Sequence, residues 1–375
     1  MNKNSSQRAS AQGKIRVGIF FGGRSAEHDV SVRSAKNIID ALDRTKFTPV
    51  LIGIDQQGYW HSVDSPASLS DKVTQVVLSD AELTDSEHQE LELLSFDFYK
   101  KALGNQRLDI DVAFPVLHGP YGEDGSIQGL FEVANIPYVG PGVLSSSINM
   151  DKDVSKRLLK AADIAVAPFL VVRPDRSIDF NAAANALGIP LFIKPANMGS
   201  SVGVYKVSNE EDFAKALDNA LEYDTKVLIE SAIIGEEIEC SVLGNDSPEA
   251  SAVGRIIPNS AEFYDYSAKY IDENGAVLEI PADIAPEIVE AARKTAIKAY
   301  RTLECEGMSR VDMFVTQDNE IVVNELNTIP GFTNISMYPK LWEASGLSYT
   351  DLITQLIELA IERHSRRSLL KTTPL

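Results

Sequence analysis

The sequence has few cysteines and no long apolar run. Its 375 residues include only two cysteines, Cys240 and Cys305, which cannot form a disulfide framework and so favour a reducing compartment such as the cytoplasm. No apolar run reaches the roughly 18 residues that a membrane-spanning helix needs, so we expect no membrane insertion. The segment MNKNSSQRASAQG at 1–13 lacks the apolar stretch of a signal peptide, and we expect a disordered tail there.

Basic residues are scarce relative to acidic ones. The chain has 35 Lys and Arg against 54 Asp and Glu, with a formal net charge of -19. Nucleic-acid-binding surfaces need clustered Lys and Arg, so we expect no nucleic-acid partner. The acidic balance speaks mainly to solubility and does not exclude a local basic pocket for an anionic small molecule.

The remaining composition is that of an ordinary globular protein, with 44% hydrophobic and 24% charged residues. The length suits two or three domains. Apolar runs at 14–25 and 47–55 flank a helical pattern at 31–42, which predicts a strand–helix–strand unit with parallel strands. A run at 109–119 returns to this sheet after a polar insertion at 56–108, which we expect to be irregular with a helix near its end.

The rest of the chain indicates two more domains. We expect an N-terminal α/β domain at 14–142, a central domain at 143–235 and a C-terminal domain at 236–375. The expected central elements are a helix at 149–163, strands at 168–173, 189–194, 202–207 and 226–230, and a helix at 210–222. The expected C-terminal elements are strands at 237–244 and 251–258, a Tyr-rich loop at 263–272, helices at 286–302 and 348–364, and a hairpin at 309–327.

The segment RVDMFVTQDNEIVVNELN at 310–327 predicts a β-hairpin with its loop at 317–320 and Thr316 facing Ile321. In that register Asp312 lies across from Glu325, and Arg310 across from Asn327. Opposed carboxylates repel each other unless a cation joins them, and two carboxylates with a carboxamide suit Mg²⁺ or Mn²⁺. The alternative is the solvated outer face of an ordinary hairpin. Strand alternation places Arg310, Asp312, Phe314, Val323, Glu325 and Asn327 on one face, and Val311, Met313, Val315, Val322 and Leu326 on the buried face.

Two further segments have the chemistry of a phosphate or nucleotide site. In FIKPANMGSSVGVYKV at 192–207, Lys194 ends a strand before a loop in which backbone N–H groups, Ser200 and Ser201 could bind phosphate. The order of residues is not that of a P-loop, and a plain hairpin turn is the alternative. In VLIESAIIGEEIE at 227–239, Glu230 and Glu237 flank a linker between domains; they could bind a ligand or be ordinary solvated residues.

Two Gly-rich loops follow strands of the first domain. FGGRSAEHDVS at 21–31 leads from a Gly turn into a helix whose N-terminus could bind an anion. It lacks the GxGxxG pattern, so a dinucleotide site and a dehydrogenase are weakly supported. LHGPYGEDG at 117–125 carries His118, for which a structural role is the alternative.

Taken in order, GGRSAEHDVS, LHGPYGEDG, NMDK, IKPANMGSSVGV, FYDYSAKY, SRVDMF and NELNTIPGFTNIS make the chain resemble the D-alanine–D-alanine ligases of the ATP-grasp superfamily, over roughly residues 15–365. The resemblance implies a three-domain α/β ATP-grasp ligase with an N-terminal parallel α/β (pre-ATP-grasp) domain. It implies ATP-dependent ligation of two D-alanine molecules through D-alanyl phosphate, for peptidoglycan precursor synthesis in the cytoplasm. The family commonly forms homodimers.

The resemblance also implies roles for individual residues. Those implied to bind ATP are Lys152, Lys194, Ser200, Ser201, Glu230, Ile233, Glu237, Phe263, Lys269 and Phe314. Those implied to hold two Mg²⁺ or Mn²⁺ ions are Asp312, Glu325 and Asn327. Glu27 and His118 resemble first-substrate contacts, and those implied for the second substrate and the oxyanion are Arg310, Gly331 and Ser336. The set implied to orient both substrates and a closing loop at 263–272 is Glu27, Ser200 and Tyr270.

Other functions remain as alternatives. The nearest are the same fold making D-alanyl-D-lactate or D-alanyl-D-serine; the FYDYxxKY pattern that ends at Tyr270 resembles the dipeptide-forming enzymes. Another ATP-grasp ligase is disfavoured by GGRSAEHDVS and LHGPYGEDG in the first domain. A non-catalytic ATP-binding protein would be expected to have lost Arg310 or a metal ligand, and the chain keeps all of them.

Overall fold

The computed structural model describes residues 13–58, 60–63, 110–175, 178–258 and 276–371. Several expectations fall outside these residues. They are the tail at 1–13 apart from its last residue, most of the insertion at 56–108, and the loop at 263–272 with Phe263, Lys269 and Tyr270.

The first sheet is built from strands near the N-terminus, in the order β3-β2-β1-β4. Its elements are β1 (Ile15–Gly22), α1 (His28–Ala41), β2 (Phe47–Ile54), β3 (Trp60–Val63), β4 (Val112–Val116) and α4 (Ser126–Ala134). Strand β1 pairs in parallel with both β2 and β4, which confirms the predicted parallel unit. Strand β3 pairs antiparallel with β2, so the prediction of an irregular segment from residue 56 was wrong at this strand.

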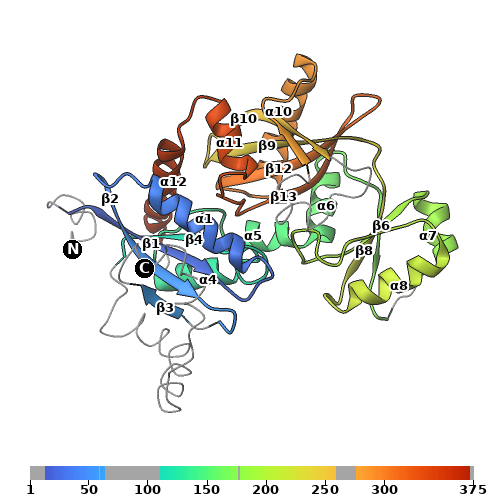
Figure 1. Ribbon diagram of the computed structural model, residues 1–375, viewed down its shortest axis with the longest axis horizontal. Helices are drawn as coiled ribbons and strands as arrows, with labels where there is room; N and C mark the ends of the chain where they lie inside the picture. The colour runs from blue at the N-terminus through green and yellow to red at the C-terminus, as the bar shows by residue number, and fades with distance from the viewer. Residues whose placement is uncertain (1–12, 59, 64–109, 176–177, 259–275, 372–375) are drawn as a thin grey trace, which may run out of the picture.

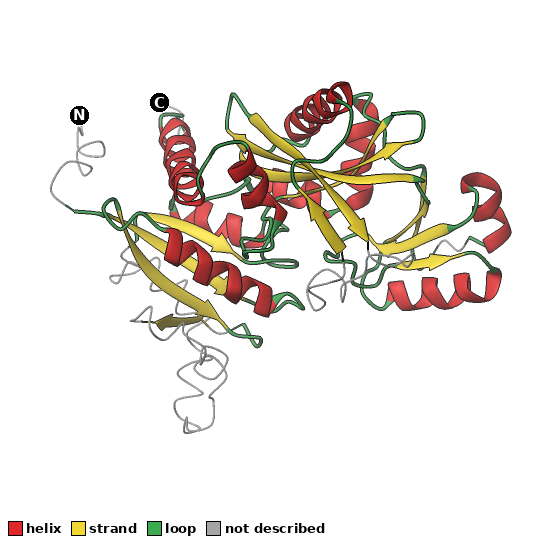
Figure 2. Ribbon diagram, turned by 45° about the horizontal axis from the view of Figure 1, so that its top comes forward, coloured by secondary structure: helices red, strands yellow, loops and turns green. Residues whose placement is uncertain are grey.

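The second sheet has the order β5-β8-β6-β7, and all of its pairs are antiparallel. Its strands are β5 (Phe169–Val172), β6 (Leu191–Pro195), β7 (Tyr205–Val207) and β8 (Val227–Ser231). Helices α7 (Phe180–Leu187) and α8 (Glu210–Leu221) pack on it (Figure 2). The loop at 196–204, which carries Ser200 and Ser201, is named the Gly/Ser loop. A strand follows it as expected, although β7 is shorter than the run at 202–207.

Two helices lead into this sheet where one was predicted. Helix α5 (Val143–Met150) ends and α6 (Lys152–Ala161) begins on either side of Asp151, whose backbone is extended. The Asp151 carboxylate accepts a hydrogen bond from the Val154 N–H at 3.1 Å and so caps α6. The single helix predicted at 149–163 was therefore wrong at its start.

The third sheet is antiparallel, with the order β11-β10-β9-β12-β13. Its elements are β9 (Gly235–Gly244), β10 (Glu249–Pro258), β11 (Ala276–Glu279), α10 (Pro286–Thr302), β12 (Gly307–Thr316), β13 (Ile321–Asn327), α11 (Met337–Ala344) and α12 (Tyr349–Ser368). It lies between the other two sheets along the long axis of the molecule (Figure 1).

The β12–β13 hairpin has the predicted pairs Arg310 with Asn327 and Asp312 with Glu325. Its turn differs from the prediction, because Val315 pairs with Ile321 and a bulge at Asn324 restores the register. The bulge reverses two predicted orientations: Val323 pairs with Met313 in the core, and Val322 pairs with Phe314 on the other face.

The C-terminal helix completes the core of the first sheet. Side chains of α12 share one apolar cluster with β1, β4 and α1, and α12 lies beside α1 in Figure 1. Arg363 of α12 donates a hydrogen bond to the Tyr138 carbonyl at 2.8 Å. Phe332 has no exposed surface. The centre of its ring lies 6.0 Å from that of Phe114 and 5.6 Å from that of Tyr338. The segment after β13 is therefore fixed against the first sheet.

Replacing Phe332 by alanine should destabilise the protein, because it leaves a cavity where the first and third sheets meet. We expect the free energy of unfolding to fall by about 3 kcal/mol or more, measured by thermal and urea unfolding. Leu144→Ala, at a side chain that is 63% exposed, is the control and should change it by less than about 0.5 kcal/mol. Equal stabilities of the two variants would contradict this view of the core.

Candidate active site

Two loops meet where strands of the first and third sheets end. His118, after β4, makes a hydrogen bond from Nδ1 to the Ile329 carbonyl at 3.0 Å. Glu123 accepts hydrogen bonds from the N–H groups of Gly119 at 2.7 Å and Ile329 at 3.2 Å. The loop that carries His118 is thus joined to the one that follows β13.

The Gly/Ser loop of the second sheet reaches the first sheet. The Ser200 hydroxyl donates a hydrogen bond to the carboxylate of Glu27, a buried residue that directly precedes α1. Ser200 and Ser201 have positive φ angles of 53° and 60°, a conformation uncommon for residues with a side chain. The structure therefore brings together Glu27 and Ser200, two members of the orienting set predicted from the sequence.

Arg310 lies at the centre of a charge cluster on the hairpin. Its Nε and Nη2 donate to the two oxygens of Asp312 at 2.7 and 2.8 Å, and its Nε also lies 2.9 Å from Oε2 of Glu239. Such two-point arginine–carboxylate pairing fixes both groups. Glu239 was not predicted, although it follows Glu237 by two residues and so shares its face of β9.

The register places three acidic residues in one row across β9, β12 and β13. Asp312 pairs with Glu239 on one side and with Glu325 on the other. Glu325 lies 3.3 Å from the Lys152 ammonium, which also donates to the Met198 carbonyl at 2.6 Å. Lys152 therefore connects the hairpin with the Gly/Ser loop.

Asp312, Glu325 and Asn327 fit a hard divalent cation by their chemistry. All three offer oxygen donors on one face of the hairpin, and Asn327 donates its amide N–H to Asp312 at 2.9 Å, which leaves its amide oxygen free of that bond. The positive charges of Arg310 and Lys152 balance the two carboxylates in this structure. No group of three or more His, Cys, Asp or Glu side chains suited to a metal occurs in the described part of the chain; the predicted set has two carboxylates and one amide.

A buried ion triad joins α6 to strands β6 and β8 of the second sheet. Oε2 of Glu230 lies 2.6 Å from the Lys194 ammonium, and its Oε1 lies 3.2 Å from the ammonium of Lys156 on α6. Burial opposes ionisation of Glu230, but the two lysine charges outweigh it and hold the pKa of this carboxyl below its usual range. Burial lowers the pKa of Lys156 to about 8. Lys156 was missed in the sequence, where its only signal is a position one helical turn after Lys152.

Buried His118 and half-buried Glu123, both near Glu27, have shifted pKa values. Burial lowers the pKa of His118 below its ordinary value, because the charged imidazolium would lose its hydration. Burial, with the nearby negative charge of Glu27, raises the pKa of the Glu123 carboxyl well above its usual range. The surroundings of His118 near Glu27 therefore favour a neutral imidazole.

The other predicted residues lie around this centre. Ser336 directly precedes α11, and its Oγ accepts the Thr333 N–H at 3.0 Å. A Cβ at Gly331 would come 2.7 Å from that oxygen, so a larger residue there would displace the Ser336 hydroxyl. Phe314 pairs with Glu237 across β12 and β9, and Ile233 lies in the linker between β8 and β9.

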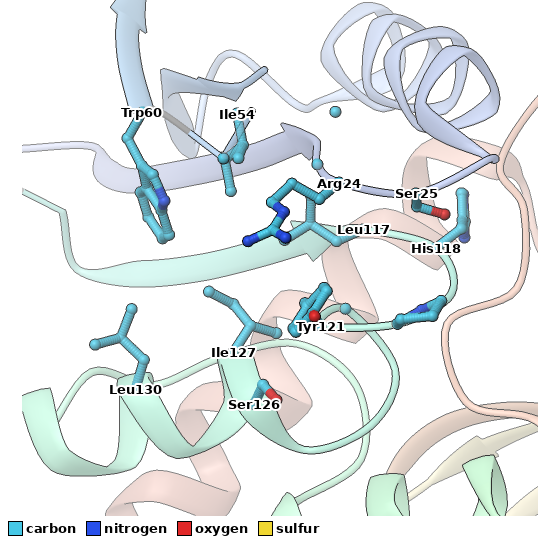
Figure 3. A pocket seen from close by; sticks show the side chains of 15 residues that line it. Arg24, Ser25, Ile54, Trp60, Leu117, His118, Tyr121, Ser126, Ile127 and Leu130 are labelled. Carbon is cyan, nitrogen blue, oxygen red and sulfur yellow. The ribbon is translucent and has the colours of Figure 1, made fainter. Parts of the chain in front are cut away.

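A cavity of about 320 Å³ borders the site at the first sheet (Figure 3). Arg24, Trp60, Tyr121 and Leu130 line it, with the Arg24 guanidinium 5.3 Å from the centre of the Tyr121 ring. Of the predicted residues it contains His118 alone. The charged residues that suit phosphate and metal lie outside this cavity, so it does not mark the centre of the site.

The antiparallel second and third sheets, with a lysine-rich site between them and a parallel α/β unit beside them, define a ligase of the ATP-grasp fold, as predicted. Two family models match the chain, described as D-ala D-ala ligase N-terminus at residues 16–141 and D-ala D-ala ligase C-terminus at residues 158–358. The chain belongs to the D-alanine–D-alanine ligase family.

Individual relatives agree with this assignment. D-alanine–D-alanine ligase A of Escherichia coli (strain K12) is 53% identical over 371 residues, which cover 96% of this chain and 99% of the relative. The structure of the D-alanine–D-alanine ligase from Coxiella burnetii matches with a TM-score of 0.79 and 37% identity, over 95% of this chain and 96% of that one. The VanG D-Ala:D-Ser ligase from Enterococcus faecalis matches with a TM-score of 0.78 and 34% identity, over 93% and 100%.

Enzymes of this family are ATP-dependent, and the predicted class of ligase is confirmed.

Among the helices that the structure describes, none is both long enough and apolar enough to cross a membrane.

His118 should be neutral near pH 7, with its proton on Nδ1, because the Ile329 carbonyl accepts from that nitrogen and burial disfavours the cation. We expect nitrogen-15 NMR over about pH 5 to 8 to show this tautomer and a pKa below 6.5. His118→Gln identifies the signal by its loss. A proton on Nε2, or protonation above that value, would contradict the geometry.

Proposed function

We propose that this protein joins two D-alanine molecules into D-alanyl-D-alanine while ATP is converted to ADP and phosphate, for peptidoglycan precursor synthesis in the cytoplasm. The observation that carries the proposal is the contact of Lys152 with both Glu325 and the Gly/Ser loop, while Ser200 of that loop holds Glu27. Groups suited to an amino acid, a phosphate and a metal therefore converge on one site.

In the first step, a carboxylate oxygen of one D-alanine attacks the γ-phosphorus of ATP. The new oxygen–phosphorus bond forms as the bond to the β–γ bridging oxygen breaks, and ADP leaves. Glu27 binds the ammonium group of this D-alanine, and the neutral His118 accepts a hydrogen bond from the same substrate. Lys152 and Lys194 offset the negative charge of the transferring phosphoryl group.

In the second step, the amine of the other D-alanine attacks the carbonyl carbon of D-alanyl phosphate. The carbon–nitrogen bond forms, phosphate leaves with the electrons of the carbon–oxygen bond, and the proton lost by the nitrogen passes to this phosphate. Arg310 and the Gly331 N–H stabilise the oxyanion of the tetrahedral intermediate. Acyl phosphates hydrolyse in water, so the site must exclude solvent during this step.

Two Mg²⁺ or Mn²⁺ ions would be held by Asp312, Glu325 and Asn327, where they would neutralise phosphate oxygens. The further ATP contacts that we propose from the family resemblance are Ser201, Glu230, Ile233, Glu237, Phe263, Lys269 and Phe314. Tyr270 joins Glu27 and Ser200, and Ser336 contacts the second substrate.

The proposed domains are 14–142, 143–235 and 236–375, and the proposed assembly is a homodimer.

The product assay tests the reaction and the choice of second substrate. The purified protein with D-alanine, ATP and Mg²⁺ should release one phosphate for each D-alanyl-D-alanine formed. With equal D-serine or D-lactate added, D-alanyl-D-alanine should remain the main product. No dipeptide would disprove the proposed function, and a predominance of D-alanyl-D-serine or D-alanyl-D-lactate would disprove the choice of substrate.

Glu325→Gln should lower kcat by about 100-fold or more, because it removes a charged metal ligand and leaves the volume of the side chain unchanged. Product formation and thermal unfolding are measured together. Glu320→Gln, at the exposed turn of the same hairpin, is the matched control and should retain wild-type turnover. If Glu325→Gln also turned over at the wild-type rate, its assignment to the metal would be wrong.

A further inference from the structure

Lys156 is a charged residue that none of the roles above uses. It lies on α6 with no exposed surface, and its ammonium is 3.2 Å from Oε1 of Glu230. Lys194 takes the other oxygen of Glu230 at 2.6 Å, and Lys194 and Glu230 are themselves 8% and 3% exposed. Two buried cations thus share one buried anion, and the triad keeps one uncompensated positive charge.

Stability alone does not account for this arrangement. Burying a charge is costly, and even a matched buried ion pair is often no more stable than apolar residues of the same size. A second cation on the same carboxylate adds desolvation cost and repulsion from Lys194. An excess positive charge held out of water is useful where an anion is to be bound.

The Lys156 ammonium also retains hydrogen-bonding capacity. Its nitrogen lies 3.2 Å from Oε1 of Glu230 in poor hydrogen-bond alignment, so this contact engages at most one of its three N–H groups. Lys226, another buried lysine of the same domain, differs in this respect. It donates hydrogen bonds to both Asp151 and Asp153 of the α6 start, and its charge is fully compensated.

We propose that Lys156 is a further positioning residue of the nucleotide site, which neutralises Glu230 so that the charge of Lys194 is available to the phosphates of ATP. The inference rests on the proposed role of Lys194 at ATP. With Lys156 charged, its positive charge neutralises Glu230, and the two lysines together fix the orientation of the Glu230 carboxylate. Without it, Glu230 and Lys194 cancel each other, and Glu230 can draw Lys194 away from the ligand.

The charges around Lys156 come from several elements. Glu230 on β8 and Lys194 on β6 are in the triad, and Glu325 on β13 acts on Lys156 through its charge. Because burial lowers the pKa of Lys156 to about 8, its charge is present below that pH and is lost above it. Lys156→Arg keeps a positive charge at any pH that the protein survives.

The test compares Lys156→Met, Lys156→Arg and the control Lys226→Met in the full chain. Lys156→Met should raise the KM for ATP at least about tenfold, with kcat and the KM for D-alanine nearly unchanged. The Kd of ATP measured by calorimetry without D-alanine should weaken by a similar factor. Lys156→Arg should restore most of the affinity, and Lys226→Met should alter thermal stability more than the KM for ATP.

The outcomes decide between a positioning role and a structural one. An unchanged Kd of ATP in folded Lys156→Met, or an equal loss in Lys226→Met, would overturn the inference. If Lys156→Met does not fold, ATP binding is followed across pH 8 instead: the wild type should lose affinity and Lys156→Arg should not, and identical profiles would overturn it. Loss of ATP affinity in Lys156→Met without any dipeptide from the wild type would reject the proposed function and leave the inference standing.

Discussion

A carboxylate removed from water needs a partner, and in this protein the partners come from other parts of the chain. Glu27 of the first sheet is held by Ser200, Glu325 of the third by Lys152, and Glu230 of the second by Lys156 and Lys194. Because each unpaired group would be costly, the contacts of Glu27 and Glu325 tie the Gly/Ser loop and α6 to the first and third sheets. The contacts of Glu230 tie α6 to the second sheet. The same contacts gather the groups that the proposed reaction would use, so the residues that join the domains of the fold also form the candidate site.

The first sheet depends on the far end of the chain in a second way. Its apolar face is covered by α12 and by Phe332, which follows Gly331 directly. The loop from Ile329 to Ser336 is therefore fixed between a core residue and the hydrogen bonds to His118 and Glu123. A loop held at both ends can present its N–H groups without reorganisation, which is the condition for stabilising a short-lived oxyanion.

Much of the fold was predictable because its signals are local. Apolar periodicity gave the parallel unit of β1, α1 and β2 and placed α10 at Pro286–Thr302, and alternation on two strands gave the pair of Asp312 and Glu325. The hairpin also shows the limit of such patterns. The exchange of Val322 and Val323 comes from a bulge at Asn324, where the register shifts by one residue between the Asp312–Glu325 and Met313–Val323 pairs. Alternation alone cannot reveal such a shift.

By itself, the sequence determined the family, the order of most elements and the candidate site residues, because motifs and periods are properties of neighbouring residues. Only the tertiary structure decided which charges meet. Glu239 joins Arg310 through the pairing of β9 with β12. Lys156 reaches Glu230 because α6, whose Leu159 packs in the core of the third sheet, also borders the second sheet. Coulomb energy and desolvation depend on distance and burial in space, and neither can be read from spacing along the chain.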